Sequence, residues 1–305
     1  MNIKNFHIIS LFLPLATLIL LGSAKNHTSQ ASRNLATIKA IYNLTVFPNN
    51  VPFITQGFSA IPAGLFNANA TGRVSPLGNF SGFEESAEYF FGLAPTPQAP
   101  FYAAFATADV VEFSSCGDVA SSVVRFDARV LNQSRPDFGK HVTYLKEIAF
   151  WKFDKDGAVL AYDAWIPNLA LFELYFGGTA PKDCPSAYNP GSLSIAVPVD
   201  DSILGLCGSI QQLCTGSNLQ YKDVAECANV LHTKRFGIAD ELWGDDVVCR
   251  FVHVLLARIR PEVHCPHVGP TGGGKCVDVQ YDQVYFEDDQ VLFGGVGDNI
   301  FMCGK

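Results

Sequence analysis

The stretch EIAFWKFDKDGAVLAYDAW, residues 147–165, decides the fold. Two runs with a side-chain period of two flank the tetrapeptide Asp-Lys-Asp-Gly, and this period is typical of strands. The tetrapeptide ends in Gly157, which can adopt the positive φ angle that tight hairpins require. We therefore predict two antiparallel strands, Val142–Phe153 and Ala158–Ile166. A calcium loop is not predicted here, because the glutamate that such loops need downstream is missing.

The same alternation extends toward the N-terminus, and helical periodicity precedes it. We predict two further strands at Phe101–Phe113 and Val123–Leu131, with a short strand at Ala70–Pro76. Helical spacing covers Ser29–Tyr42 and Gly82–Phe91. Helices followed by a long antiparallel meander indicate an α+β fold, with the helices on one face of a curved sheet.

Two segments together resemble a known family. The string GRVSPLGNFSGFEESAEYF, residues 72–90, followed by the strand pair at 147–165, is similar to the NTF2-like superfamily, close to its SnoaL-like branch. The resemblance covers roughly residues 30–170. It implies a cone, in which a bent sheet wraps around helices, with an apolar pocket open at one end. Similar domains include isomerases, cyclases, epoxide hydrolases and dehydratases, and also modules that only bind or dimerise, so the function depends on individual residues.

Asp163 is the first candidate catalytic residue. Strand alternation places it on one face with Val159, Ala161 and Trp165. If this face lines the pocket, burial beside an indole would raise the pKa of the carboxyl and make it a general acid or base. The alternative is an aspartate that is hydrogen-bonded at a rim or an interface.

Asp127 and Arg125 are the other catalytic candidates. Epoxide-opening relatives of this family use an Asp/Arg/Asp arrangement, and Asp127, Arg125 and Asp163 could imitate it. The alternative is that Arg125, Asp127 and Arg129 form a solvated cross-strand ladder on the outer face of the sheet.

The N-terminus predicts secretion. Residues 1–24 read as a signal peptide, with an apolar run at Ile8–Leu21 followed by Gly22-Ser23-Ala24, where a signal peptidase could cleave. The run is shorter than the ~20 residues of a membrane-spanning helix. Asn-x-Ser/Thr sequons, which predict a glycosylated surface, begin at Asn26, Asn43, Asn69, Asn79 and Asn132.

The cysteines divide the chain into two domains. Cys116 is the only one before residue 184, and eight follow. We predict an NTF2-like domain at 25–178, a linker at 179–198 and a disulfide-stabilised α+β domain at 199–305. Eight cysteines allow 105 pairings; a bridge from Cys227 to Cys249, between helices predicted at Lys222–Leu231 and Asp245–Arg260, is one prediction. Cys116 is either a free, partly buried thiol or a link to the second domain.

Three histidines in the second domain form a candidate metal site. His253 lies on the long predicted helix, and His264 and His267 follow its end at Pro261. If the chain turns back at Pro261, the three imidazoles meet and suit zinc or copper, because the cysteines are occupied in disulfides. The alternative is that these histidines cap helices or bind backbone carbonyls.

Charge and composition restrict the partners. The net charge of −8 excludes a basic nucleic-acid footprint, and no membrane association is expected after signal cleavage. The favoured function is a secreted glycoprotein that binds an apolar small molecule in the cone, with the cysteine-rich domain as an interaction module. The alternatives are an extracellular enzyme, acting through Asp163 or a histidine-bound metal, and a non-catalytic structural protein. A homodimer could form through the open sheet face.

Overall fold

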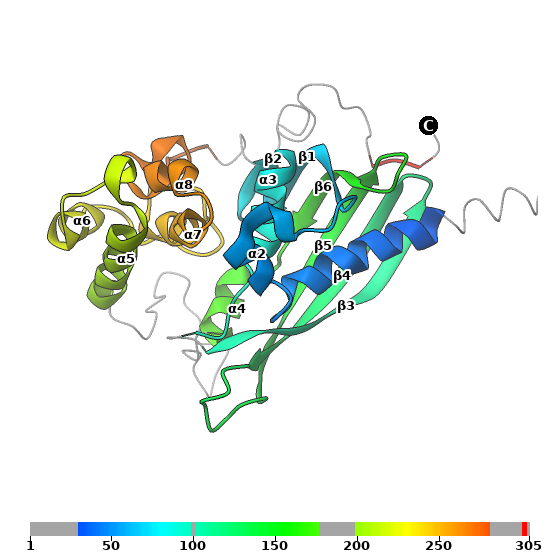
Figure 1. The fold of residues 1–305 in the computed structure, drawn as a ribbon, viewed down its shortest axis with the longest axis horizontal. Coiled ribbons are helices and arrows are strands. Elements are labelled where there is room, and N and C mark those ends of the chain that lie inside the picture. Colours follow the sequence, from blue (N-terminus) through cyan, green and yellow to red (C-terminus); the bar gives the residue numbers. More distant parts are fainter. Residues whose placement is uncertain (1–29, 99–101, 177–198, 281–300, 304–305) are drawn as a thin grey trace, which may run out of the picture.

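The computed structural model describes residues 30–98, 102–176, 199–280 and 301–303. The predicted signal peptide, Asn26, Cys184 and the linker lie outside these residues. Figure 1 shows two units: a curved sheet with helices on one face, and a bundle of short helices, residues 199–280, beside one end of it. Among the described helices, none combines the length and the apolar composition needed to cross a membrane.

The first unit is built on one six-stranded sheet, which confirms the predicted α+β cone. Its strands lie in the order β2-β1-β6-β5-β4-β3, and only β1 and β6 pair in parallel. The strands are β1 (Phe66–Ser75), β2 (Gly78–Ser81), β3 (Ala103–Cys116), β4 (Val119–Val130), β5 (His141–Phe153) and β6 (Val159–Trp165).

The predicted hairpin joins β5 and β6. Gly157 has φ +93°, and Asp154 Oδ1 accepts hydrogen bonds from the backbone N–H groups of Asp156 (2.9 Å) and Ala158 (3.0 Å). Asn67 donates to the other oxygen of Asp154 at 2.9 Å. The carboxylate therefore shapes the turn.

Helices cover the concave face of the sheet. A helix spanning residues 30–45 crosses the sheet (Figure 1) and buries Ile38, Ile41 and Tyr42 against it. The predicted helix at 82–91 is α3 (Gly82–Ala87), continued by a wider π-helical turn, η2 (Glu88–Gly92). Edge-to-face aromatic contacts join these layers. The ring centroid of Tyr42 lies 5.6 Å from that of Phe126 and 6.0 Å from those of Phe90 and Trp151.

Three helices were not predicted from the sequence. Residues 48–64, for which the sequence analysis predicted no helix, contain α2 (Val51–Gln56) and the 3-10 turn η1 (Gly57–Ala60). Pro52 is the second residue of α2 and lies in its first turn, where a missing N–H costs nothing. The helix α4 (Leu169–Phe176) follows the last strand, and α8 (Pro261–Val268) occupies the histidine segment that was expected only to turn.

The second unit is helical in its described part. It contains α5 (Val199–Leu213), η5 (Gly216–Asn218), α6 (Val224–Leu231), α7 (Val247–Ala257), α8 and η6 (Gly272–Gly274). Asp246 caps α7 by accepting from the N–H of Cys249 at 2.8 Å.

Three disulfides hold the helical unit together: Cys207–Cys227, Cys214–Cys265 and Cys249–Cys276. The predicted Cys227–Cys249 bridge is therefore wrong. Cys227 packs against α5 instead, and Cys249 faces the glycine-rich turn after α8. The sequence could identify Cys227 and Cys249 as buried helix residues. The disulfide partner of each depends on which helices pack together, and the sequence does not show that.

The last described residues return to the sheet of the first unit. The ring of Phe301 lies 6.2 Å from that of Phe150 on β5. Cys303 and Cys116 are both free thiols, and the side chain of Cys303 is hydrogen-bonded with that of Cys116, which raises the pKa of Cys303. Cys116 is thus free and half-buried, as one of the two predicted alternatives states.

Candidate functional site

Asp163 lies on the outer face of the sheet. On β6, Tyr162 pairs with Trp151 and points into the core, so its neighbour Asp163 points the other way. A register shift near residue 160 puts Val159 on the inner face. Simple alternation had placed Val159 on the same face as Asp163, and the shift separates them. Asp163 is 6% exposed and forms a bidentate ion pair with Arg73, at 2.7 Å and 3.0 Å.

Arg125 and Asp127 lie in a partly exposed ladder, also on the outer face. Arg125 contacts Asp109 at 3.4 Å, and Asp127 accepts from Arg129 and contacts His141, both at 2.7 Å.

The structure does not bring the Asp/Arg/Asp set together. Asp127 pairs with Tyr144 on β5, whereas Asp163 pairs with Phe150. Six residues of strand separate these two positions, which corresponds to about 20 Å. Asp127 and Asp163 therefore cannot act on one substrate atom.

A different carboxylate, Glu147, lies inside the cone. It is 4% exposed, and it accepts hydrogen bonds from the hydroxyls of Tyr42 (2.7 Å) and Tyr89 (2.8 Å). Our sequence reading missed this residue. A signal was present: Glu147 occupies an inward position of β5, in register with apolar Leu145, Ala149 and Trp151.

Burial raises the pKa of Glu147 to about 7, although the two tyrosine hydroxyls partly offset the effect. The pKa values of both tyrosines are raised, first by burial and then by Glu147. Near neutral pH this glutamate is therefore the one member of the trio that can exchange a proton.

A charged contact joins the two units. Glu88 of η2 is 1% exposed, and Arg260, just before α8, donates to both of its oxygens. Arg260 also donates to Glu84 at 2.5 Å. Burial acts to raise the pKa of Glu88, but His264 and Arg260 outweigh it and the pKa is lowered.

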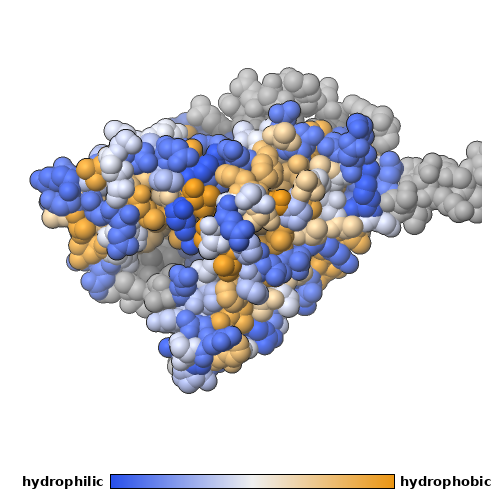
Figure 2. Space-filling view, in the orientation of Figure 1, coloured by the Kyte–Doolittle hydropathy of each residue, from blue (hydrophilic) through white to orange (hydrophobic). Residues whose placement is uncertain are grey.

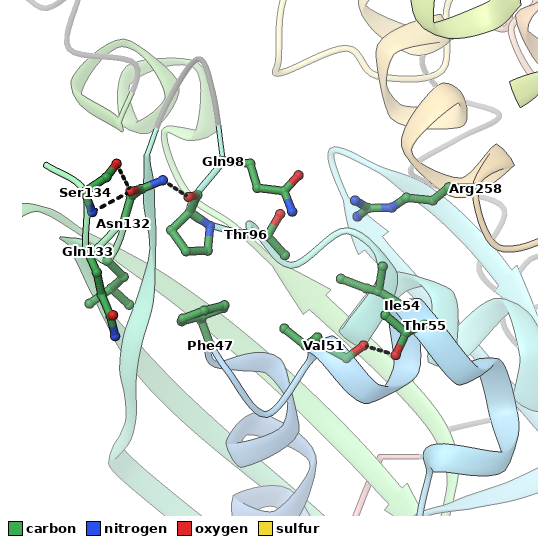
Figure 3. A pocket seen from close by; sticks show the side chains of 12 residues that line it. Phe47, Val51, Ile54, Thr55, Thr96, Gln98, Asn132, Gln133, Ser134 and Arg258 are labelled. Carbon is green, nitrogen blue, oxygen red and sulfur yellow. Dashed lines mark hydrogen bonds between the residues drawn. The ribbon is translucent and has the colours of Figure 1, made fainter. Parts of the chain in front are cut away.

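A pocket of about 370 Å³ is lined by residues of the first unit and by Arg258 of the helical unit. One wall is apolar, with Phe47 from the segment before α2 and Val51 and Ile54 from α2 itself. Figure 3 shows Asn132 on the loop across the pocket. The remaining lining residues are Thr55, Thr96, Pro97, Gln98, Leu131, Gln133, Ser134 and Arg258. Apolar side chains gather over the middle of this face of the molecule, around α2 (Figure 2). The size and the mixed lining suit a small organic ligand.

The rim of the pocket is held in shape by its own hydrogen bonds. Asn132 donates to the carbonyl of Pro97 at 3.0 Å and accepts from the N–H and the hydroxyl of Ser134, at 2.9 Å and 2.6 Å. The loop after β4 is thereby tied to the segment that precedes β3. A ligand would meet a preformed wall.

Arg258 is the charged group of this pocket. It reaches in from the end of α7 (Figure 3) and donates to the carbonyl of Gly92 at 2.9 Å. Its Nε is buried without a hydrogen-bond partner, and within the described residues no carboxylate pairs with it. Burial lowers the pKa of Arg258, but a guanidinium remains cationic at neutral pH.

The three predicted histidines do come together. His253 projects from α7, and His264 and His267 project from α8. Nδ1 of His253 lies 3.2 Å from Nδ1 of His264 and 3.2 Å from Nδ1 of His267. The chain reverses at Arg258–Arg260, so the helix pair brings together residues that are 11 and 14 positions apart.

These imidazoles are largely enclosed. His264 and His267 are 5% and 8% exposed. Burial, together with the neighbouring histidines, lowers the pKa of His253. Burial, His264 and Lys275 lower the pKa of His267 to about 4. Neutral rings are the form in which histidine offers a lone pair.

Similar solved structures cover the first unit. A protein described as a SnoaL-like polyketide cyclase from Jannaschia matches 50% of this chain and 94% of its own, with 11% identity and a TM-score of 0.32. A protein described as an isomerase of the SnoaL-like family from Agrobacterium tumefaciens matches 45% and 99%, with 11% identity and a TM-score of 0.31. The curved antiparallel sheet with helices on one face, predicted for the first unit, is confirmed by its own strand order.

Relatives in sequence cover nearly the whole chain. Aurasperone B biosynthesis cluster protein A from Aspergillus niger is 30% identical over 273 residues, which span 87% of this chain and 82% of that protein. Bifonsecin B biosynthesis cluster protein A from Aspergillus brasiliensis is 31% identical over 82% of each chain. Residues 197–279 match the family model described as the BfoA family C-terminal domain. The chain therefore belongs to the same family as these two biosynthesis cluster proteins.

Proposed function

We propose that this protein is a secreted glycoprotein that binds an apolar small molecule carrying an acidic oxygen, in the pocket of Figure 3. The observation that carries the proposal is Arg258, a half-buried guanidinium in a pocket with an apolar wall, which pairs with no carboxylate of the described residues. Such a cation favours a ligand with a carboxylate, a phenolate or an enolate at one end.

The family supports the small-molecule part of the proposal. Its relatives are named for the biosynthesis of aurasperone B and bifonsecin B, so a role on a metabolite of this kind fits the present chain. The ligand would be an intermediate or a product of such a cluster. The helical unit contributes Arg258 to the pocket, in keeping with an interaction role for that unit.

The described surface is compatible with secretion. Three disulfides are typical of an oxidising compartment. The sequon residues Asn43, Asn69 and Asn79 are exposed in the folded chain, so each could carry a glycan without disturbing the core.

Two fluorescent probes test the binding site. We expect 1-anilinonaphthalene-8-sulfonate, an aromatic anion, to bind the wild-type protein in the pocket. Arg258→Gln should weaken this binding about tenfold or more, because a hydrogen bond to a charged group is worth about 1.5–3 kcal/mol. N-phenyl-1-naphthylamine has the same skeleton without the sulfonate, and its affinity should not change.

The matched control is Arg135→Gln, which alters an exposed arginine on the neighbouring loop. It should leave both affinities unchanged. The proposal fails if Arg258→Gln and wild type bind the sulfonate probe equally, or if Arg258→Gln weakens both probes to the same extent.

A further inference from the structure

We propose that His253, His264 and His267 form a binding site for one zinc ion, close to the contact between the two units. The proposal does not depend on the small-molecule pocket, because no lining residue of that pocket belongs to the three-histidine site. It rests on the geometry of the ring nitrogens, on the available donors and on the orientation of His264.

The ring nitrogens are arranged in a way that hydrogen bonding alone does not satisfy. Nδ1 of His253 has two close neighbours, each 3.2 Å away, and both are also Nδ1 atoms. An imidazole nitrogen carries either one proton or one lone pair in the ring plane. Only one of the two contacts can therefore be a well-aligned hydrogen bond, and the other is either a bent, shared bond or a contact between two like groups. A cation between the three nitrogens accepts all three lone pairs.

The spacing fits a tetrahedral ion. Zinc–nitrogen bonds are about 2.0–2.1 Å long, so two nitrogens at the corners of a zinc tetrahedron lie about 3.3–3.4 Å apart. Both measured separations, 3.2 Å, are close to this edge. One donor atom from each of the three histidines lies within 4.8 Å of the others. Copper(II) prefers a tetragonal arrangement, so the geometry favours zinc.

The donor set consists of imidazoles only. Cys249, one turn before His253, and Cys265, adjacent to His264, are both in disulfides and offer no thiolate. The bridges fix the backbone on either side of the histidines, since Cys249 is tied to Cys276 and Cys265 to Cys214. Three histidines with a fourth position for water or a ligand are a set found at catalytic zinc sites.

Glu88 orients His264 for this role. Nε2 of His264 lies 3.1 Å from Oε1 of Glu88, which belongs to the cone; the angle is not that of a hydrogen bond, and this nitrogen has no other hydrogen-bond partner in the described residues. A carboxylate accepts a proton, so it favours the tautomer with hydrogen on Nε2 and leaves the Nδ1 lone pair facing the other histidines. Glu88 is thus a positioning residue, and metal affinity should depend on the docking of the two units.

Cobalt(II) and zinc test the site in the tag-free, full-length protein with its disulfides formed. After removal of metal with a chelator, we expect one equivalent of Co²⁺ to give the intense visible absorption of a four-coordinate ion. One equivalent of Zn²⁺ should abolish that absorption. His253→Asn and His267→Asn should lose it, whereas His232→Ala, at an exposed histidine at the end of α6, should retain it.

Two glutamate variants isolate the positioning role. Glu88→Gln should weaken Zn²⁺ binding about 10- to 100-fold. Glu84→Gln, which alters a partner of Arg260 that has no contact with His264, should leave the affinity unchanged. Far-ultraviolet circular dichroism of every variant identifies those that fail to fold.

The wild-type measurement alone can overturn the proposal. Absence of the four-coordinate Co²⁺ spectrum, or Co²⁺ absorption that Zn²⁺ does not displace, would show that the three histidines are not a zinc site. So would equal Zn²⁺ affinities of wild type and a folded His267→Asn variant. The probe experiments on Arg258 are unaffected by any of these results, so the two proposals can fail separately.

Discussion

At the scale of single residues, Glu147 is where burial and charge conflict most clearly. The unfolded chain holds this carboxyl at its ordinary pKa of 4.5, and the folded chain raises it to about 7. A group whose pKa is raised on folding stabilises the fold fully only below its unfolded value, and this stability is lost as the pH rises through the folded value. The protein should therefore be less stable at pH 8 than at pH 5 on account of this residue.

Glu147→Gln should remove that pH dependence. Between pH 5 and pH 8 the free energy of unfolding of wild type should fall by about 2–3 kcal/mol relative to the variant, as measured by urea unfolding at both values. Glu112→Gln, at an exposed position of β3, is the control and should follow wild type. Parallel pH profiles of wild type and Glu147→Gln would contradict the prediction.

The sequence predicted one part of the candidate sites, the three histidines, and missed another, the buried carboxylate Glu147. The three histidines meet because α7 and α8 pack against each other, and the sequence indicated this through Pro261. Asp163 and Glu147 are both acidic residues on apolar strands, and the choice between them depends on which face points inward. For Glu147 the alternation along β5 indicated the inward face, whereas for Asp163 the register shift between β5 and β6 hid it by placing Val159 on the opposite face.

At the scale of elements, the parallel pairing of β1 with β6 depends on a glycine. Gly72 lies opposite Tyr162, and a Cβ atom on Gly72 would be 2.2 Å from the tyrosine ring. Gly72→Ala should destabilise the protein by about 1–3 kcal/mol, the usual cost of an overpacked core. Removing the ring with Tyr162→Leu in the same chain should recover part of the loss introduced by the alanine.

Gly205→Ala is the matched control for this substitution. Gly205 lies in α5, where an added Cβ meets no atom within 4 Å. Alanine should stabilise the helix there by about 0.5–1 kcal/mol. Thermal unfolding of both variants checks the pair, and a Gly72→Ala protein as stable as wild type would show that β1 and β6 can move apart.

Strands were easier to predict than short helices for a physical reason. The four long strands have inward apolar residues at a period of two, so their existence and approximate bounds followed from the sequence. In α8, Pro261 begins the helix and Pro266 lies inside it. Two prolines in eight residues are typical of a turn, and packing against α7 overrides that preference.

At the scale of the whole molecule, the tail links the end of the chain to the cone. Cys303 and Cys116 are free thiols in hydrogen-bonding contact, and Phe301 packs near Phe150. We expect mild oxidation to join Cys116 to Cys303. Peptide mapping of the non-reduced protein should then show this bridge, which needs no rearrangement of the three disulfides of the helical unit.

Cys303→Ser provides the control for that bridge. Cys116 should then remain open to alkylation after oxidation. A wild-type protein in which Cys116 is alkylated as readily after oxidation as before would contradict the prediction.

The contact between Glu88 and Arg260 has a consequence for how the two units evolve. Glu88 is a carboxylate of the cone that is 1% exposed, and its counter-charge comes from the other unit. A lineage that lost the helical unit would inherit an acidic residue in need of a new partner. Position 88 should therefore have changed in any descendant that keeps the cone alone, and the two units should be inherited together wherever the glutamate survives.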